Sequence, residues 1–163
     1  MSNKKNNKIV PFIVNLLIPI VGGFITWYLN KESITYYSNN INKVFFTPPS
    51  IVFSIVWSLL YVLMGIAAYR VYIKSKEEDI ENNAYFYYLI QLIFNFLWSF
   101  IFFTFRLYGI SFIWLIILLI FVIITFIKFI KIDKISGFLF IPYIIWIIYA
   151  GVLNYFVWLL NEM

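Results

Sequence analysis

The chain has 163 residues, of which 64% are hydrophobic and 12% are charged, and it contains neither Cys nor His. A soluble domain carries about 25% charged residues, and a soluble fold of this length could not bury so much apolar surface. The composition therefore predicts a protein of the lipid bilayer. It also excludes disulfides, thiolate chemistry, His-ligated metals and Ser–His triads.

Five stretches are long and apolar enough to cross a bilayer, which takes about 20 mostly apolar residues. They lie at about 9–29, 49–73, 84–105, 110–127 and 138–160. The first stretch follows basic residues, as in a signal peptide, but no small-residue cleavage pattern follows it. We therefore predict an all-α integral membrane protein whose residues 1–163 form one domain, a five-transmembrane-helix bundle.

Basic residues predict the orientation, because cytoplasmic loops carry an excess of Lys and Arg. With five spans, the N-terminus, the second loop and the fourth loop lie on the same side of the membrane. Most basic residues fall on that side: Lys4, Lys5, Lys8, Arg70, Lys74, Lys76, Lys128, Lys131 and Lys134. We predict a cytoplasmic N-terminus and an external C-terminus in a bacterial plasma membrane. This topology accounts for the net charge of +5, so no nucleic-acid partner is expected.

The segment between the first two spans, residues 30–48, is longer than an ordinary connector and is predicted to be a functional loop. It carries Tyr36, Tyr37 and two adjacent phenylalanines, so it is expected to fold back over the end of the bundle. At its end, Thr47 is expected to cap the second helix, with Pro in the first helical position.

Polar and aromatic side chains recur at helical spacing inside three spans, and in lipid such groups face the bundle interior. The aligned residues are Phe53, Trp57 and Tyr61, then Gln91, Asn95 and Trp98, then Tyr143, Trp146, Ala150 and Asn154. They predict an aromatic pocket with a few amides, suited to a flat, apolar ligand. Alternatively, the amides only join helices and the aromatics form interfacial belts, and periodicity alone slightly favours this second interpretation.

Three motifs in chain order resemble signatures of the translocator protein family, TspO/MBR, whose members are also called tryptophan-rich sensory proteins and peripheral-type benzodiazepine receptors. The first matches PP-x3-F-x2-VW-x2-LY-x2-MG and runs from Pro48 to Gly65. The second matches QL-x2-N-x2-WS-x2-FF and runs from Gln91 to Phe103. The third matches PY-x2-W-x3-A-x2-LN and runs from Pro142 to Asn154.

The resemblance implies a five-helix bundle with a pocket that opens toward the loop between the first two helices. It implies binding of porphyrins such as protoporphyrin IX, of haem and of benzodiazepine-type drugs, with no required cofactor, and it makes a homodimer the expected assembly. Phe46 stands where the family usually has Trp. The residues that we predict to bind ligand, from the resemblance and the helical faces together, are Tyr37, Phe46, Pro48, Pro49, Phe53, Trp57, Tyr61, Gln91, Asn95, Trp98, Tyr143, Trp146, Ala150, Leu153 and Asn154.

Three functions remain open at this point. The chain is expected to bind tetrapyrroles as a sensor, carrier or regulator, to degrade protoporphyrin IX with light and oxygen, or to act as a structural or regulatory bundle on partner proteins. By resemblance, Trp57 and Trp146 would be catalytic if degradation occurs. The lack of buried acids, bases and metal ligands favours binding, although an excited porphyrin could itself supply the reactivity.

Overall fold

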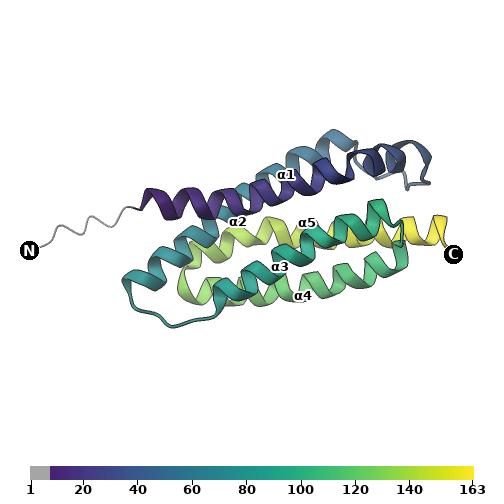
Figure 1. The fold of residues 1–163 in the computed structure, drawn as a ribbon. Helices are drawn as coiled ribbons and strands as arrows, with labels where there is room; N and C mark the ends of the chain where they lie inside the picture. Colours follow the sequence, from purple (N-terminus) through teal and green to yellow (C-terminus); the bar gives the residue numbers. More distant parts are fainter. Residues whose placement is uncertain (1–7) are drawn as a thin grey trace, which may run out of the picture.

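Residues 8–163 are described by the structure, a computed structural model in which antiparallel helices form a bundle (Figure 1). The elements are α1 (Ile9–Asn40), α2 (Ser50–Glu77), α3 (Ala84–Ser99), the π-helical turn η1 (Phe100–Thr104), α4 (Tyr108–Ile132) and α5 (Lys134–Asn161). With η1 continuing α3, the described chain contains five helices long and apolar enough to cross a membrane, and no strand. The prediction of an all-α five-helix bundle is confirmed.

The first helix is longer than the sequence predicted. Instead of ending near Leu29, α1 continues to Asn40, so the connecting loop shrinks to residues 41–49 and Tyr36 and Tyr37 lie on the helix. No Gly or Pro interrupts the chain between Gly23 and Pro48, so nothing stops the helix where its side chains become polar. Counting apolar residues predicts the length of the membrane-crossing part of a helix. The helix itself can continue beyond that part, as α1 does.

The start of α2 also differs from the prediction. Thr47 does not cap the helix, because Pro49 occupies the N-cap position and Ser50 is the first helical residue. A residue that precedes proline is driven toward extended backbone, which removes Thr47 and Pro48 from the helix. Pro49 itself is extended, with ψ of 149°. The other helix ends move outward by a few residues, because α2, α4 and α5 carry their flanking Lys residues on helical turns.

The half of the bundle nearest the N-terminus has a filled aromatic core. The ring centroids of Phe129 and Phe140 lie 5.1 Å apart, and those of Tyr88 and Phe129 lie 5.7 Å apart. On the other side, Gly65 lets α1 approach α2 closely, since a Cβ there would lie 2.8 Å from the Cα of Leu16. Aromatic packing and close backbone approach thus hold the helices together in this half.

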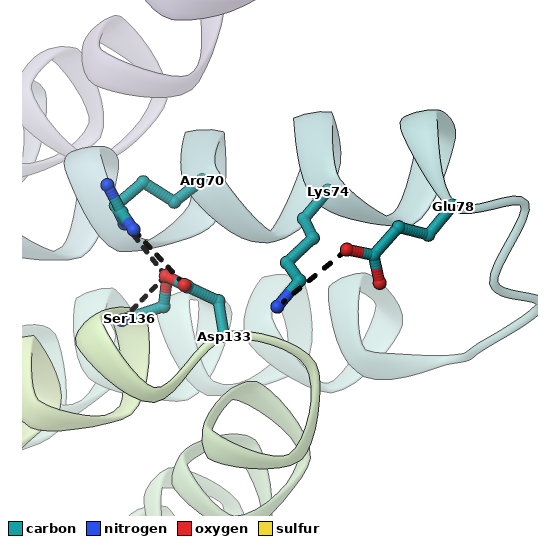
Figure 2. A network of polar contacts seen from close by, with 5 residues as sticks. All are labelled: Arg70, Lys74, Glu78, Asp133 and Ser136. Carbon is teal, nitrogen blue, oxygen red and sulfur yellow. Dashed lines mark hydrogen bonds and ion pairs between the residues drawn. The ribbon is translucent and has the colours of Figure 1, made fainter.

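An ion pair at the same end ties α2 to the turn between α4 and α5 (Figure 2). Arg70 Nε donates to Asp133 Oδ2 at 2.7 Å, and its Nη2 donates to Oδ1 at 3.1 Å. Asp133 also caps α5, since its Oδ2 accepts from Ser136 N at 3.0 Å and Ser136 Oγ at 2.6 Å. The Arg70 guanidinium, helped by Ser136 and opposed by burial, lowers the pKa of Asp133 to about 2.

Replacing Asp133 by Asn should lower the free energy of unfolding at pH 7 by about 1–2 kcal/mol. Asn caps a helix about as well as Asp, so the loss reports the charge-assisted bonds to Arg70. The matched control is Glu78→Gln, which removes an exposed carboxylate 3.9 Å from Lys74 and should cost less than about 0.5 kcal/mol. Thermal unfolding in detergent micelles measures both, and equal effects would contradict the interpretation.

The same pair gives a pH dependence. Because the pKa of Asp133 is lowered from an ordinary value near 4, its stabilisation is present above about pH 4 and is lost as the pH falls toward about 2. The difference in stability between the wild type and Asp133→Asn should therefore close across that interval. A constant difference from pH 7 to pH 2 would show that the carboxylate charge is not its origin.

Candidate functional site

The other half of the bundle encloses a cavity of about 880 Å³. Its wall comes from α1, α2, the α3–η1 segment, α5 and the loop of residues 41–49, which lies at the right-hand end in Figure 1. The volume falls within the roughly 300–1,000 Å³ typical of sites for small molecules and cofactors. Most of the wall is aliphatic or aromatic, with scattered hydroxyl and amide groups. This half of the molecule can therefore accept a sizeable apolar ligand.

The aromatic wall follows from the helical spacing of α2. Phe53, Trp57 and Tyr61 are four residues apart, so they project from successive turns of one helix face toward the cavity. The rings of Trp57 and Tyr61 stack with centroids 5.5 Å apart and an interplanar angle of 29°. Across the bundle, α1 presents Gly23, where a Cβ would clash with the Tyr61 ring. A small residue is thus needed for α1 to pass this ring.

A chain of hydrogen bonds lies behind the aromatic wall and joins α2, α3 and α5. The Tyr61 hydroxyl donates to Asn95 Oδ1 at 3.0 Å, and Asn95 Nδ2 donates to the Tyr143 hydroxyl at 2.9 Å. The Tyr143 hydroxyl donates to Gln91 Oε1 at 2.9 Å. Gln91 Nε2 in turn lies 3.9 Å from Met64 Sδ. The chain satisfies polar groups that lipid could not solvate, and it engages both amides inside the protein.

A second polar cluster surrounds Asn154, at the part of the wall contributed by α5. Asn154 Oδ1 accepts from Trp98 Nε1 at 3.1 Å and from Ser111 Oγ at 2.9 Å, while its Nδ2 donates to Tyr108 O at 2.8 Å. The Trp98 ring stacks on Phe102 with centroids 5.1 Å apart. Trp98 and Asn154 therefore reach the wall with their polar atoms already paired, and they offer a ligand mainly surface and shape.

The loop of residues 41–49 is held in place by α5. The Tyr149 hydroxyl donates to Phe46 O at 2.8 Å, and the Phe46 ring packs on Phe156 with centroids 5.7 Å apart. Further out, Asn161 accepts from Asn42 N and donates to Asn42 O, both at 3.1 Å. These contacts fix the loop against the end of the cavity.

Most of the predicted ligand-binding residues lie on the cavity wall: Tyr37, Pro48, Pro49, Phe53, Trp57, Tyr61, Trp98, Ala150, Leu153 and Asn154. The predicted residues that do not line the cavity are Phe46, Gln91, Asn95, Tyr143 and Trp146. Gln91, Asn95 and Tyr143 belong to the hydrogen-bond chain. The two amides therefore join helices, as in the alternative interpretation of the sequence. Phe46 contacts α5, as described above.

Trp57 and Trp146, matched to a tryptophan pair by resemblance, occupy different positions. Trp57 lies on the wall, whereas Trp146 packs edge-on against Phe53 with centroids 5.5 Å apart. Phe53 belongs to the wall, so Trp146 stands one ring behind it. The indole N–H of Trp146 is buried, and within the described part of the chain it has no hydrogen-bond partner.

Several wall residues were missed by sequence reasoning, above all on α1. Thr26 and Asn30 are spaced four residues apart on one helix face, and Asn30 Oδ1 accepts from Thr104 Oγ1 at 2.6 Å. Their spacing was visible in the sequence, but the predicted helix ended at about residue 29. Lys43 and Thr47 also line the cavity. The sequence places them in the loop, and no pattern in it predicts that they contact the cavity.

The comparisons with known proteins agree with this architecture. The TspO/MBR family model matches residues 15–159. Protein CrtK of Rhodobacter capsulatus is 35% identical over 123 residues, which is 76% of this chain and 77% of that protein. Tryptophan-rich protein TspO of Archaeoglobus fulgidus is 33% identical over 153 residues, or 94% and 98% of the two chains. The translocator protein of Ovis aries is 28% identical over 158 residues, or 94% and 91%.

The fold and the cavity define a class, that of five-helix integral membrane proteins with an aromatic pocket inside the bundle. Within that class, the family match over nearly the whole chain shows that the chain belongs to the TspO/MBR family. The resemblance noted from the three sequence motifs is thereby confirmed.

Replacing Tyr143 by Phe should destabilise the bundle by about 1–2 kcal/mol, because it leaves Asn95 Nδ2 and Gln91 Oε1 without a partner. Tyr155→Phe is the matched control on the same helix. Tyr155 is exposed, and its ring packs against Phe112. Because that ring contact remains in the variant, removal of the hydroxyl should change the free energy of unfolding by less than about 0.5 kcal/mol. Thermal unfolding in micelles measures both, and equal stabilities would contradict the role given to the hydrogen-bond chain.

Proposed function

We propose that the protein binds porphyrins, protoporphyrin IX and haem among them, inside the cavity, and that it serves as a sensor, carrier or regulator of tetrapyrrole levels. The observation that carries the proposal is the stacked pair of Trp57 and Tyr61 on the wall of a cavity of about 880 Å³. A flat conjugated macrocycle gains both apolar burial and offset stacking against such rings. Membership of the TspO/MBR family is consistent with this ligand class.

The chemistry of the wall limits how such a ligand is held. The amides of Gln91, Asn95 and Asn154 are engaged by protein partners, so shape and stacking would supply most of the affinity. The sequence has no His and no Cys, so haem would be held without the axial ligands that most haem proteins use. Discrimination between metal-free and iron-containing macrocycles is therefore expected to be weak.

The second candidate is breakdown of protoporphyrin IX driven by light and oxygen. The positions of Trp57 and Tyr61 favour it, because both side chains are oxidisable and both face the space that the ligand would occupy. The excited porphyrin would supply the reactivity, and the protein would hold it and limit its access to water. The third candidate, a regulatory bundle acting on other membrane proteins, becomes the better account if no tetrapyrrole binds.

We infer that the protein spans a plasma membrane of bacterial type, with its N-terminus cytoplasmic and its C-terminus outside. The distribution of charge supports this, because the end of the bundle with the α2–α3 and α4–α5 connections holds most of the described basic residues: Lys8, Arg70, Lys74, Lys76, Lys128, Lys131 and Lys134. Lys4 and Lys5, counted with them from sequence, lie outside the described residues. In this orientation the loop of residues 41–49 faces the exterior.

The orientation can be tested cleanly because the sequence contains no native Cys. Single cysteines replace Phe45, which is 99% exposed in the 41–49 loop, and Lys76, which is exposed at the opposite end. A membrane-impermeant maleimide applied to intact spheroplasts should label the first variant and not the second, and lysis should make both reactive. Labelling of the Lys76 variant and not of the Phe45 variant in intact spheroplasts would show the opposite orientation.

The binding proposal is tested by titrating the purified protein in micelles with protoporphyrin IX and following tryptophan fluorescence. We expect quenching in the low micromolar range and an increase in Kd of about 3- to 10-fold for Trp57→Phe. Trp146→Phe should have a smaller effect, because Trp146 stands behind Phe53. The matched control is Trp114→Phe, since Trp114 donates to Phe94 O at 2.9 Å and does not line the cavity.

The outcomes separate the candidates. Equal effects of Trp57→Phe and Trp114→Phe would place the porphyrin elsewhere, and absence of binding at low micromolar concentration would favour the regulatory bundle. Irradiation of the complex in air, followed by visible spectroscopy, forms the second arm of the experiment. Bleaching faster than that of free porphyrin supports degradation by the protein. Bleaching at the same rate excludes this candidate.

A further inference from the structure

The cavity wall is covered on one side and exposed on the other. Its residues on α3, η1 and α5 are all buried or half-buried. On α1, by contrast, Phe24 and Trp27 line the cavity and are also 61% and 50% exposed. On α2, Ser54 and Ser58 likewise line the cavity and are exposed. Residues with both properties lie at the edge of an opening, and we call the opening between these four residues the slot.

The slot begins where α1 and α2 move apart. Near the N-terminal half of the bundle the two helices are in close contact, at Gly65 against Leu16 and at Gly23 against the Tyr61 ring. Beyond Tyr61, toward the 41–49 loop, both helices contribute residues to the cavity wall, so the cavity lies between them. The close contact ends where the glycines end, and the slot occupies the gap that follows.

The α2 edge of the slot consists of small side chains. Ser50, Ser54 and Ser58 are four residues apart, so they follow one line along the helix. Ser58 Oγ donates to Ser54 O at 2.8 Å, and Ser54 Oγ donates to Ser50 O at 3.4 Å. Each of these two hydroxyls is satisfied by its own helix, so it can face lipid without an unpaired polar group. Small side chains at this edge leave the slot open.

The slot faces the hydrocarbon region of the bilayer. Phe24 and Trp27 lie within the apolar stretch of α1, and Ser54 and Ser58 lie within that of α2. The end of the cavity nearer to water is covered by the 41–49 loop, which α5 holds through Tyr149 and Asn161. The cavity is therefore open toward lipid and covered toward water.

We infer that apolar ligands enter and leave the cavity sideways through the slot, from the lipid, and not from water past the 41–49 loop. The inference rests on the proposed function, because it takes the cavity as the ligand site, and it adds the route. A flat conjugated macrocycle partitions into the bilayer, since its transfer from water to an apolar phase is favourable. Passing edge-on between α1 and α2, it meets Trp57, which lines the cavity between Ser54 and Ser58 in the chain.

The first test narrows the slot. The full-length protein in lipid vesicles is mixed with protoporphyrin IX, and quenching of tryptophan fluorescence gives the rate constants of association and dissociation. Ser58→Phe should lower both by about tenfold and change Kd by less than about threefold, because an obstacle on the route slows both directions. Ser58→Ala, which keeps the slot open, should retain the wild-type rates. The matched control is Leu59→Phe, which adds a ring at an exposed neighbour that does not line the cavity.

The second test fixes the loop. Asn161 bonds to both N and O of Asn42, so cysteines at these two positions can be joined by a short bifunctional maleimide in a chain that has no other Cys. Cross-linking should leave the association rate constant within about twofold of that of the same variant before cross-linking, since the loop is not on the route.

The other outcomes overturn the inference. Slower association after cross-linking would place the route at the loop, and equal slowing by Ser58→Phe and Leu59→Phe would show that the slot is not the obstacle. A loss of affinity in Ser58→Phe with unchanged association would place the new ring in the binding site and not on the route. If the wild type binds no porphyrin, the proposed function itself fails. Thermal unfolding shows whether each variant is folded, and if Ser58→Phe is not, the cross-linked protein decides.

Discussion

The hydrogen-bond chain from Tyr61 through Asn95 and Tyr143 to Gln91 is the constraint on which the site depends. A bilayer offers no water to buried polar groups, so a side chain that carries an amide or a hydroxyl into the bundle needs a protein partner. Three helices meet these requirements together, because α2, α3 and α5 each supply a member of the chain. In doing so they hold Tyr61, and with it the stacked Trp57, at the surface of the cavity.

One half of the bundle is packed for stability, and the other half contains the cavity. Near the N-terminus, an aromatic core joins α3, α4 and α5, and the Arg70–Asp133 ion pair joins α2 to the α4–α5 turn. Toward the opposite end the helices enclose open space, and the loop over it is held by Tyr149 and Asn161. Because α5 is capped by Asp133 of the ion pair and takes part in the hydrogen-bond chain and the loop contacts, it connects the tightly packed half to the wall of the cavity.

Much of this organisation could be predicted from the sequence, because a polar residue within a membrane span must face the interior of the bundle. The spacing of Phe53, Trp57 and Tyr61 was enough to identify the inward face of α2. The use of each polar atom was not predictable: nothing in the spacing shows that Asn95 bonds to a tyrosine and not to a ligand. The length of α1 was missed because the prediction counted apolar residues, whereas the helix continues through polar residues until Asn40, where no Gly or Pro has yet stopped it.

In this member of the TspO/MBR family the physical site is an aromatic cavity with a chain of paired polar groups behind its wall. Our central claim is that a flat conjugated ligand lies within the bundle, against Trp57 and Tyr61. A structure of the protein determined with bound protoporphyrin IX tests this most directly. We expect density for the macrocycle between α1, α2 and α5, against the rings of Trp57 and Tyr61. Density on the lipid-facing surface of the helices, with the cavity unchanged, would contradict it.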